Sequence, residues 1–141
     1  LDKTFGLHYS TGPSRAWING GTPAQSYLTG ATTGKPLASF FESLATPATD
    51  WVFMLGLLGI GVALILGIGT RLAALAGVVM LGFMYAAVAP WVWGSLNPVV
   101  NEHLVYALVL ILVPLTNAGD TIGLGTWWKG LGLVKKLPFL V

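Results

Sequence analysis

The 141-residue chain contains no cysteine, and this absence excludes several kinds of chemistry. Disulfide bonds, thiolate metal sites, cysteine-ligated iron–sulfur clusters and dithiol redox motifs all require that residue. The chain has only two histidines, and their spacing from the scattered carboxylates matches no metal site. It also has no haem-attachment motif and no dinucleotide fingerprint. We therefore predict no metal and no haem in this chain.

Charge is also scarce, because only 9% of the residues are charged, against about 25% in soluble domains. The formal net charge of +2 is too small and too scattered for a nucleic-acid-binding surface. By contrast, 55% of the residues are hydrophobic, and the mean hydropathy is +0.77. A small core cannot bury that much apolar surface. The composition therefore predicts an all-α integral membrane protein in contact with membrane lipids.

Three apolar runs predict membrane spans, over residues 50–69, 71–93 and 101–116. The third is short for the roughly 20 residues that cross a bilayer. The first two are almost contiguous, which predicts a tight antiparallel hairpin. Small residues let helices approach closely in lipid, and the first span carries five glycines. These are Gly56, Gly59, Gly61, Gly67 and Gly69.

Residues 1–49 are polar and rich in turn formers, which predicts a cap on the membrane domain. Short helices are expected over 14–18 and 36–44. The second carries an apolar stripe, Leu37, Phe40, Phe41 and Leu44. The cap either lies in the interface, anchored by Trp17, Tyr27 and Trp51, or packs as a loop over the bundle mouth. With an interfacial tail over 117–141, in which Trp127-Trp128-Lys129 is an anchor, the chain forms one domain, 1–141.

Charge asymmetry predicts an orientation. Arg71 between the first two spans and the tail lysines Lys129, Lys135 and Lys136 are separated by two spans, so they share one side, and positive residues favour the cytoplasm. The cap then faces outward and the C-terminus is cytoplasmic. The stretch 1–6 is typical of the exit of a helix that begins before Leu1. Together with the three runs, that helix predicts a four-helix transmembrane bundle.

The stretch 97–106 places a polar cluster directly before the third span. In a helix that starts at Asn101, Tyr106 lies four residues from Glu102 and three from His103, so the three side chains share one face. Ionisable groups at membrane depth are costly, and they often have a function. Glu102, His103 and Tyr106 are therefore the candidate catalytic residues.

Several motifs resemble those of the DoxX/DoxD family, in the family's order along the chain. They are Leu1-Asp2-Lys3-Thr4-Phe5-Gly6-Leu7, Arg15-Ala16-Trp17-Ile18-Asn19-Gly20-Gly21, Asn97-Pro98, Asn101-Glu102-His103-Leu104-Val105-Tyr106-Ala107-Leu108 and Gly119-Asp120-Thr121-Ile122-Gly123-Leu124. The resemblance implies a four-helix protein of a prokaryotic cell membrane. It also implies kinship to the DoxD subunit of thiosulfate:quinone oxidoreductase, and so a membrane subunit of a quinone-linked oxidoreductase.

Such chemistry needs two sites. Thiosulfate is an anion, and the outer cap supplies Lys3 and Arg15, with Trp17 and Asn19 in the same family-like stretch. Quinone, bound as a substrate, needs hydrogen-bond donors and a proton route. His103 and Tyr106 are candidate donors, and Glu102 is a candidate proton relay. Electrons pass directly between the two substrates, or through another membrane subunit of a respiratory or redox complex.

The same residues also have purely structural interpretations. Glu102 can stabilise a helix N-terminus that Asn101 caps, His103 can hydrogen-bond within the bundle, and Tyr106 can be an interfacial anchor. Asp2 and Lys3 can form a local ion pair, and Arg15 can contact lipid headgroups. The alternative function is a non-catalytic accessory subunit of a larger membrane respiratory complex, bound through its glycine-rich faces and its cap.

Overall fold

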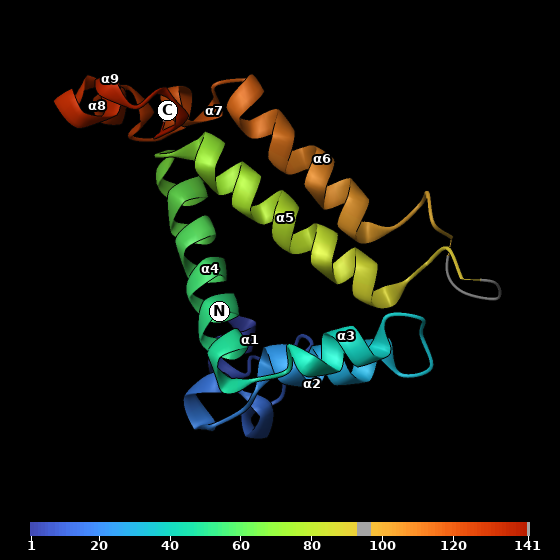
Figure 1. The fold of residues 1–141 in the computed structure, drawn as a ribbon. Coiled ribbons are helices and arrows are strands. Elements are labelled where there is room, and N and C mark those ends of the chain that lie inside the picture. Colours follow the sequence, from blue (N-terminus) through green and yellow to red (C-terminus); the bar gives the residue numbers. More distant parts are fainter. Residues whose placement is uncertain (93–96, 141) are drawn as a thin grey trace. The chain divides into compact units, whose positions relative to one another are not determined.

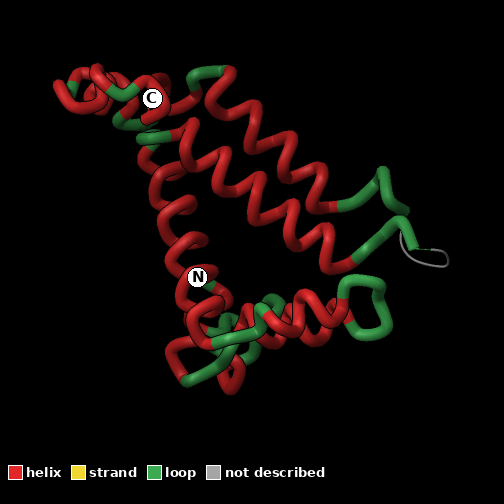
Figure 2. The backbone as a smooth tube through the Cα atoms, viewed as in Figure 1, coloured by secondary structure: helices red, strands yellow, loops and turns green. Residues whose placement is uncertain are grey.

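The computed structural model describes residues 1–92 and 97–140, and every regular element in that part is helical (Figures 1 and 2). The α-helices are α1 (Asp2–Phe5), α2 (Pro23–Thr32), α3 (Ala38–Ser43), α4 (Pro47–Leu66), α5 (Thr70–Val88), α6 (Glu102–Leu115), α7 (Ala118–Ile122), α8 (Gly125–Gly130) and α9 (Gly132–Lys136). Short 3-10 helices span Pro13–Arg15, Trp17–Asn19 and Pro138–Leu140. The predicted all-α class is confirmed.

Helices α4 and α5 are long and apolar enough to cross a membrane. Helix α4 begins and ends three residues earlier than predicted. It ends at Leu66 because Gly67 and Gly69 adopt left-handed φ values of 69° and 55°. Helix α5 ends at Val88, just before Ala89, which has a φ of 46°. Trp93, the predicted end of that span, lies outside the described residues.

Helix α6 nearly matches the predicted third span, and at 14 residues it is as short as expected. It ends at Leu115, and Asn117 then turns the chain with a left-handed φ of 50°. The tail that follows is a series of short helices, α7 to α9, each of which contacts the next. None of these three helices is long enough to cross a bilayer.

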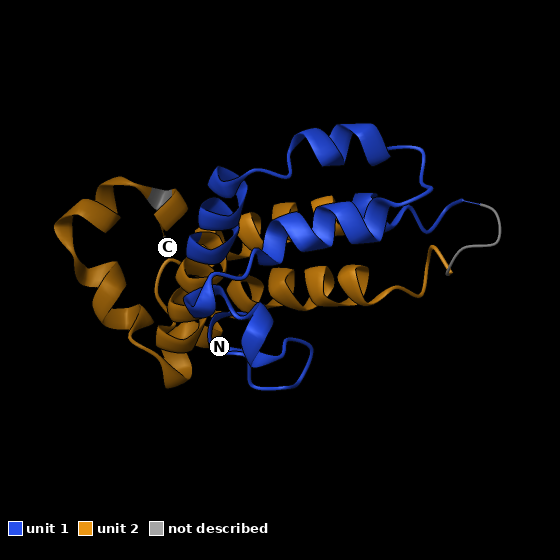
Figure 3. Ribbon diagram, turned by 90° about the horizontal axis from the view of Figure 1, so that it is seen from below, with its two compact units in different colours: residues 1–55, 86–92 blue, residues 56–85, 93–141 orange. Residues whose placement is uncertain are grey.

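The chain divides into two compact units (Figure 3). Unit 1 comprises residues 1–55 and 86–92, and unit 2 comprises residues 56–85 and 93–141. In unit 1, α2 packs against α3, and Phe41 is buried. In unit 2, α5 and α6 run side by side. There a Cβ atom on Gly77 would lie 2.6 Å from Leu110 Cδ1, so the glycine admits a bulky neighbour.

The cap differs from expectation mainly at α2, a ten-residue helix that the sequence does not predict. The predicted helix over 14–18 is instead a pair of 3-10 turns, separated by Ala16 in an extended conformation. The predicted helix over 36–44 is α3, shorter at both ends. The side chains of its predicted apolar stripe differ in burial: Phe41 is buried, whereas Phe40 is half exposed.

Candidate functional site

The approach to α6 is held by asparagine side chains. Asn97 Oδ1 accepts hydrogen bonds from the backbone N–H groups of Val99, at 2.8 Å, and Val100, at 3.0 Å. The Tyr85 hydroxyl of α5 donates to the Pro98 carbonyl at 2.9 Å. Such local side-chain bonds replace the backbone partners that an irregular segment lacks. The polar cluster therefore has a defined structure before the apolar helix begins.

Asn101 caps α6, as the structural interpretation predicts. Its backbone is extended, with a φ of −126°, and its Oδ1 accepts the His103 N–H at 2.9 Å. The same oxygen lies 2.8 Å from His103 Nδ1. Both side chains are buried, with exposed fractions of 7% and 6%. Asn101 and His103 thus form a buried polar pair in the first turn of a largely apolar helix.

The other two candidate catalytic residues lie apart from that pair. Glu102 is exposed, and 58% of Tyr106 is exposed. In the described part of the chain, no hydrogen bond or ion pair joins any two of Glu102, His103 and Tyr106. Helical spacing places the three on neighbouring positions, but only His103 turns inward. The structure therefore brings together Asn101 and His103, and it leaves Glu102 and Tyr106 at the surface.

The four candidate substrate-binding residues all lie in unit 1, and each makes contacts within it. Lys3 Nζ donates to Ser10 Oγ at 3.2 Å and to Thr11 Oγ1 at 2.9 Å. Asn19 Nδ2 donates to a backbone carbonyl at 2.9 Å. Trp17 meets the ring of Trp51 edge to face, with centroids 4.7 Å apart. Arg15 is exposed at the end of its 3-10 turn, where its backbone N–H donates to the Gly12 carbonyl at 3.0 Å.

Asp2 and Lys3 do not form the predicted ion pair; each binds the loop that follows α1. The Asp2 carboxylate accepts the Tyr9 N–H at 3.1 Å and both the N–H and the hydroxyl of Ser10, at 3.2 and 3.0 Å. Partial desolvation acts to raise the pKa of Asp2, but these hydrogen bonds outweigh it and hold the pKa below its ordinary value. The family-like start of the chain is therefore a local cluster of hydrogen-bonded side chains.

The sequence reasoning missed a buried carboxylate, Asp50, which is only 3% exposed. Its Oδ1 accepts the N–H groups of Ala24, at 2.6 Å, and Gln25, at 3.3 Å, and its Oδ2 accepts the Gln25 side-chain amide. Those N–H groups belong to the first turn of α2, which no local side chain caps. Pro23 at the helix start was the available signal, but it does not identify a cap that comes from α4.

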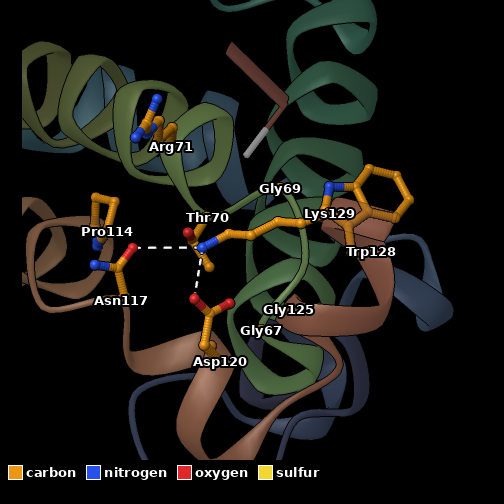
Figure 4. Close-up of a pocket in the computed structure, with 11 residues that line it drawn as sticks. Gly67, Gly69, Thr70, Arg71, Pro114, Asn117, Asp120, Gly125, Trp128 and Lys129 are labelled. Carbon is orange, nitrogen blue, oxygen red and sulfur yellow. Dashed lines mark hydrogen bonds and ion pairs between the residues drawn. The ribbon is translucent and has the colours of Figure 1, made fainter. Parts of the chain in front are cut away.

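In unit 2, a small hollow lies between the α4–α5 turn and the tail (Figure 4). Lys129 forms an ion pair with Asp120 at 2.6 Å and donates to Asn117 Oδ1 at 3.4 Å. Arg71 and Trp128 also line the hollow. It has room for about one water molecule, so it is too small for a quinone.

Glycine contacts seat the tail beside that hollow. A Cβ on Gly67 would lie 2.6 Å from the Cα of Gly119, and one on Gly123 would lie 2.6 Å from the Leu66 carbonyl oxygen. The Leu124 N–H donates to that same carbonyl at 2.7 Å. Only residues without a side chain allow backbones to come so close. The family-like stretch 119–124 therefore has a packing role.

Comparison of the chain with protein-family models, with curated proteins and with solved structures finds no match. Among residues 1–92 and 97–140, no group of three His, Asp or Glu side chains is placed to hold a metal ion. At the start of α6, the Asn101–His103 pair is a buried polar contact next to a largely apolar helix. That pair and the exposed apolar surfaces of the long helices are the features that bear on function.

Proposed function

We propose that the chain is an integral membrane protein. The observation that supports this is a stripe of exposed apolar side chains at helical spacing along α4. Its members are Val52, Leu55, Leu58, Val62 and Ile65, exposed by 44% to 83%. In the most apolar stretches of α4 and α5, only 11% and 22% of the residues are buried. A core helix of a soluble protein would be mostly buried, so lipid is the solvent that suits these helices.

In the proposed arrangement α4, α5 and α6 are three spans of a four-helix transmembrane bundle of the DoxX/DoxD type. The cap faces outward and the tail lies at the cytoplasmic face of a prokaryotic membrane. Within unit 2, Arg71 and Lys129 line the same hollow, which supports a common side for the α4–α5 turn and the tail. Positive residues at that side favour the cytoplasm.

The lack of cysteine gives a clean test of this orientation. Thr33→Cys in the cap and Thr126→Cys in the tail are single thiols at exposed positions. An impermeant maleimide should label Thr33→Cys in intact cells and label Thr126→Cys only after the cells are opened. Labelling of both positions in intact cells, or release of the protein from membranes by alkaline carbonate, would contradict the proposal.

The proposed activity is that of a membrane subunit of a quinone-linked oxidoreductase, with thiosulfate as the donor and other membrane subunits as partners. The resemblance to the DoxX/DoxD family motivates this proposal, and the Asn101–His103 pair supports it. A buried imidazole next to apolar helix surface is a suitable hydrogen-bonding group for the head group of a quinone in one of its redox states. The protein would supply the ring slot and the polar contact, while electrons come from the donor or a partner subunit.

The second candidate is a non-catalytic accessory subunit. Two observations favour it: among the described residues no hydrogen bond or ion pair joins Glu102 or Tyr106 to His103, and several helix glycines face open space. A Cβ on Gly59, Gly61 or Gly82 would have no neighbour within 4 Å. Such small residues let a partner helix approach closely in lipid.

A quinone-reduction assay separates the two candidates. The complex, purified in mild detergent, is supplied with thiosulfate and a short-chain quinone. His103→Gln should abolish turnover, whereas His8→Gln, in an exposed loop, should not change it. If the intact complex turns over and both variants match it, the chain is an accessory subunit. If thiosulfate drives no quinone reduction in the complex, the proposed reaction is wrong.

A further inference from the structure

The Asn101–His103 geometry determines which ring nitrogen carries the proton. Asn101 Oδ1 accepts the backbone N–H of His103 at 2.9 Å, and a backbone N–H can only donate. This contact fixes which end of the Asn101 amide is the oxygen. The same oxygen lies 2.8 Å from His103 Nδ1. Two acceptors cannot bond to each other, so Nδ1 must carry a hydrogen and donate to Oδ1.

The second ring nitrogen is therefore an acceptor whenever the imidazole is neutral. No described residue forms a hydrogen bond with His103 Nε2. Among the described residues, every fully buried side-chain nitrogen or oxygen has a hydrogen-bond partner. Because His103 Nε2 has no such partner, it is not fully buried. Nε2 thus reaches the surface of the chain with its lone pair unused.

We propose that Asn101 is a positioning residue that holds His103 as the Nδ1–H tautomer, so that Nε2 accepts a hydrogen bond from a ligand hydroxyl. On the proposed function, that hydroxyl belongs to a reduced quinone. A quinone carbonyl is itself an acceptor, so the neutral ring cannot bond to it through Nε2. This revises the sequence-based role of His103, which was expected to donate to the quinone. The Nδ1–H tautomer of His103 instead lets the site bind a quinol hydroxyl in preference to a quinone carbonyl.

Nitrogen-15 NMR of the full chain in lipid nanodiscs tests the tautomer directly. With labelled histidine in alkaline buffer, only two ring systems contribute, and His103→Gln assigns them. We expect His103 to show a protonated Nδ1 and a bare Nε2. Asn101→Asp keeps an acceptor oxygen, so it should keep this protonation pattern. Asn101→Leu removes the acceptor oxygen and should give a mixture of the two tautomers. His8 is the internal control and should not change.

Loss of another local asparagine contact should not change the tautomer, so Asn97→Leu, which removes the acceptor of the Val99 and Val100 N–H groups, should leave the His103 signals unchanged. A wild-type spectrum with the proton on Nε2, or the same tautomer in Asn101→Leu, would overturn the proposal.

Titration with a short-chain benzoquinol and its oxidised form tests the ligand class. The quinol should shift the Nε2 signal of the wild-type chain, and the quinone should shift it at least tenfold less at equal concentration. If the tautomer is as proposed but neither compound shifts Nε2, the positioning role of Asn101 holds and the quinone-linked function fails. An equal response to both compounds would contradict the discrimination itself.

Discussion

The first fifty residues and unit 2 differ in the contacts that position their helices. In the first region, carboxylates reach across the chain to backbone N–H groups: Asp2 binds Tyr9 and Ser10, and Asp50 caps α2. In unit 2, the closest contacts come from the absence of side chains, where Gly67 meets Gly119. A polar region needs acceptors for its irregular backbone, whereas apolar helices in lipid gain most from close van der Waals contact.

These contacts predict different sensitivities for the α2 cap and for the tail contact. Removing a side chain should damage the first region, because buried N–H groups lose their acceptors. Adding a methyl group should damage the tail contact of unit 2, because backbone atoms occupy its place.

The largest effect is expected for Gly67→Ala. Its new Cβ would lie 2.6 Å from Gly119 Cα, and the residue would have to keep a φ of 69°. Both costs act together, so the free energy of unfolding should fall by about 2–5 kcal/mol. Gly59→Ala is the control, since a Cβ there meets nothing within 4 Å. Chemical unfolding followed by circular dichroism in detergent measures both variants, and equal midpoints would refute this packing role.

Asp50→Ala should be next. It leaves the N–H groups of Ala24 and Gln25 without their acceptor in a buried place, which costs about 1–3 kcal/mol. Glu42→Ala removes an exposed carboxylate of α3 and should change little. Hydrogen exchange should show faster exchange throughout α2 in Asp50→Ala only. Unchanged protection of the Ala24 amide would show that α2 does not depend on this cap.

A smaller effect is expected for Lys129→Gln, which breaks the ion pair with Asp120. The two side chains are 32% and 29% exposed, so solvent screens the pair and its loss should cost about 0.2–1 kcal/mol. Lys136→Gln, at an exposed position, is the control for charge alone. Thermal unfolding at low and high salt separates them: the difference between Lys129→Gln and wild type should shrink as salt rises.

The smallest effect concerns Asp2 and should be visible only in acid. Because its folded pKa lies below 3.8, the ionised carboxylate stabilises the loop above that value, and the contribution is lost as pH falls through the folded pKa. The Tyr9 and Ser10 amides should therefore exchange faster in strong acid. Asp2→Asn should abolish that pH dependence, and a wild-type loop insensitive to acid would contradict the assignment.

Much of the fold follows from local patterns. The apolar runs predict α4, α5 and α6 to within a few residues, apart from the end of α5, because their hydropathy is continuous and glycine or asparagine marks their ends. Asn101 is predicted as the cap of α6 because the residue that caps a helix lies next to it in the sequence. Helix α2 is not predicted, since the acceptor for its first turn lies 26 residues from Ala24.

The candidate site is likewise predicted only in part by the sequence. Residue spacing correctly indicates that Glu102, His103 and Tyr106 occupy neighbouring helix positions. It does not indicate that only His103 turns inward and bonds Asn101, because side-chain direction depends on the available partners and not on helical period alone.

The sequence by itself determined that the chain is helical and where its apolar helices run, because hydropathy and helix caps act between residues that are close along the chain. Only the tertiary structure decided which carboxylate supports α2, which glycines touch and which nitrogen of His103 is left to accept. Those outcomes depend on atoms that meet in space after the chain has folded, and no local pattern encodes such a meeting.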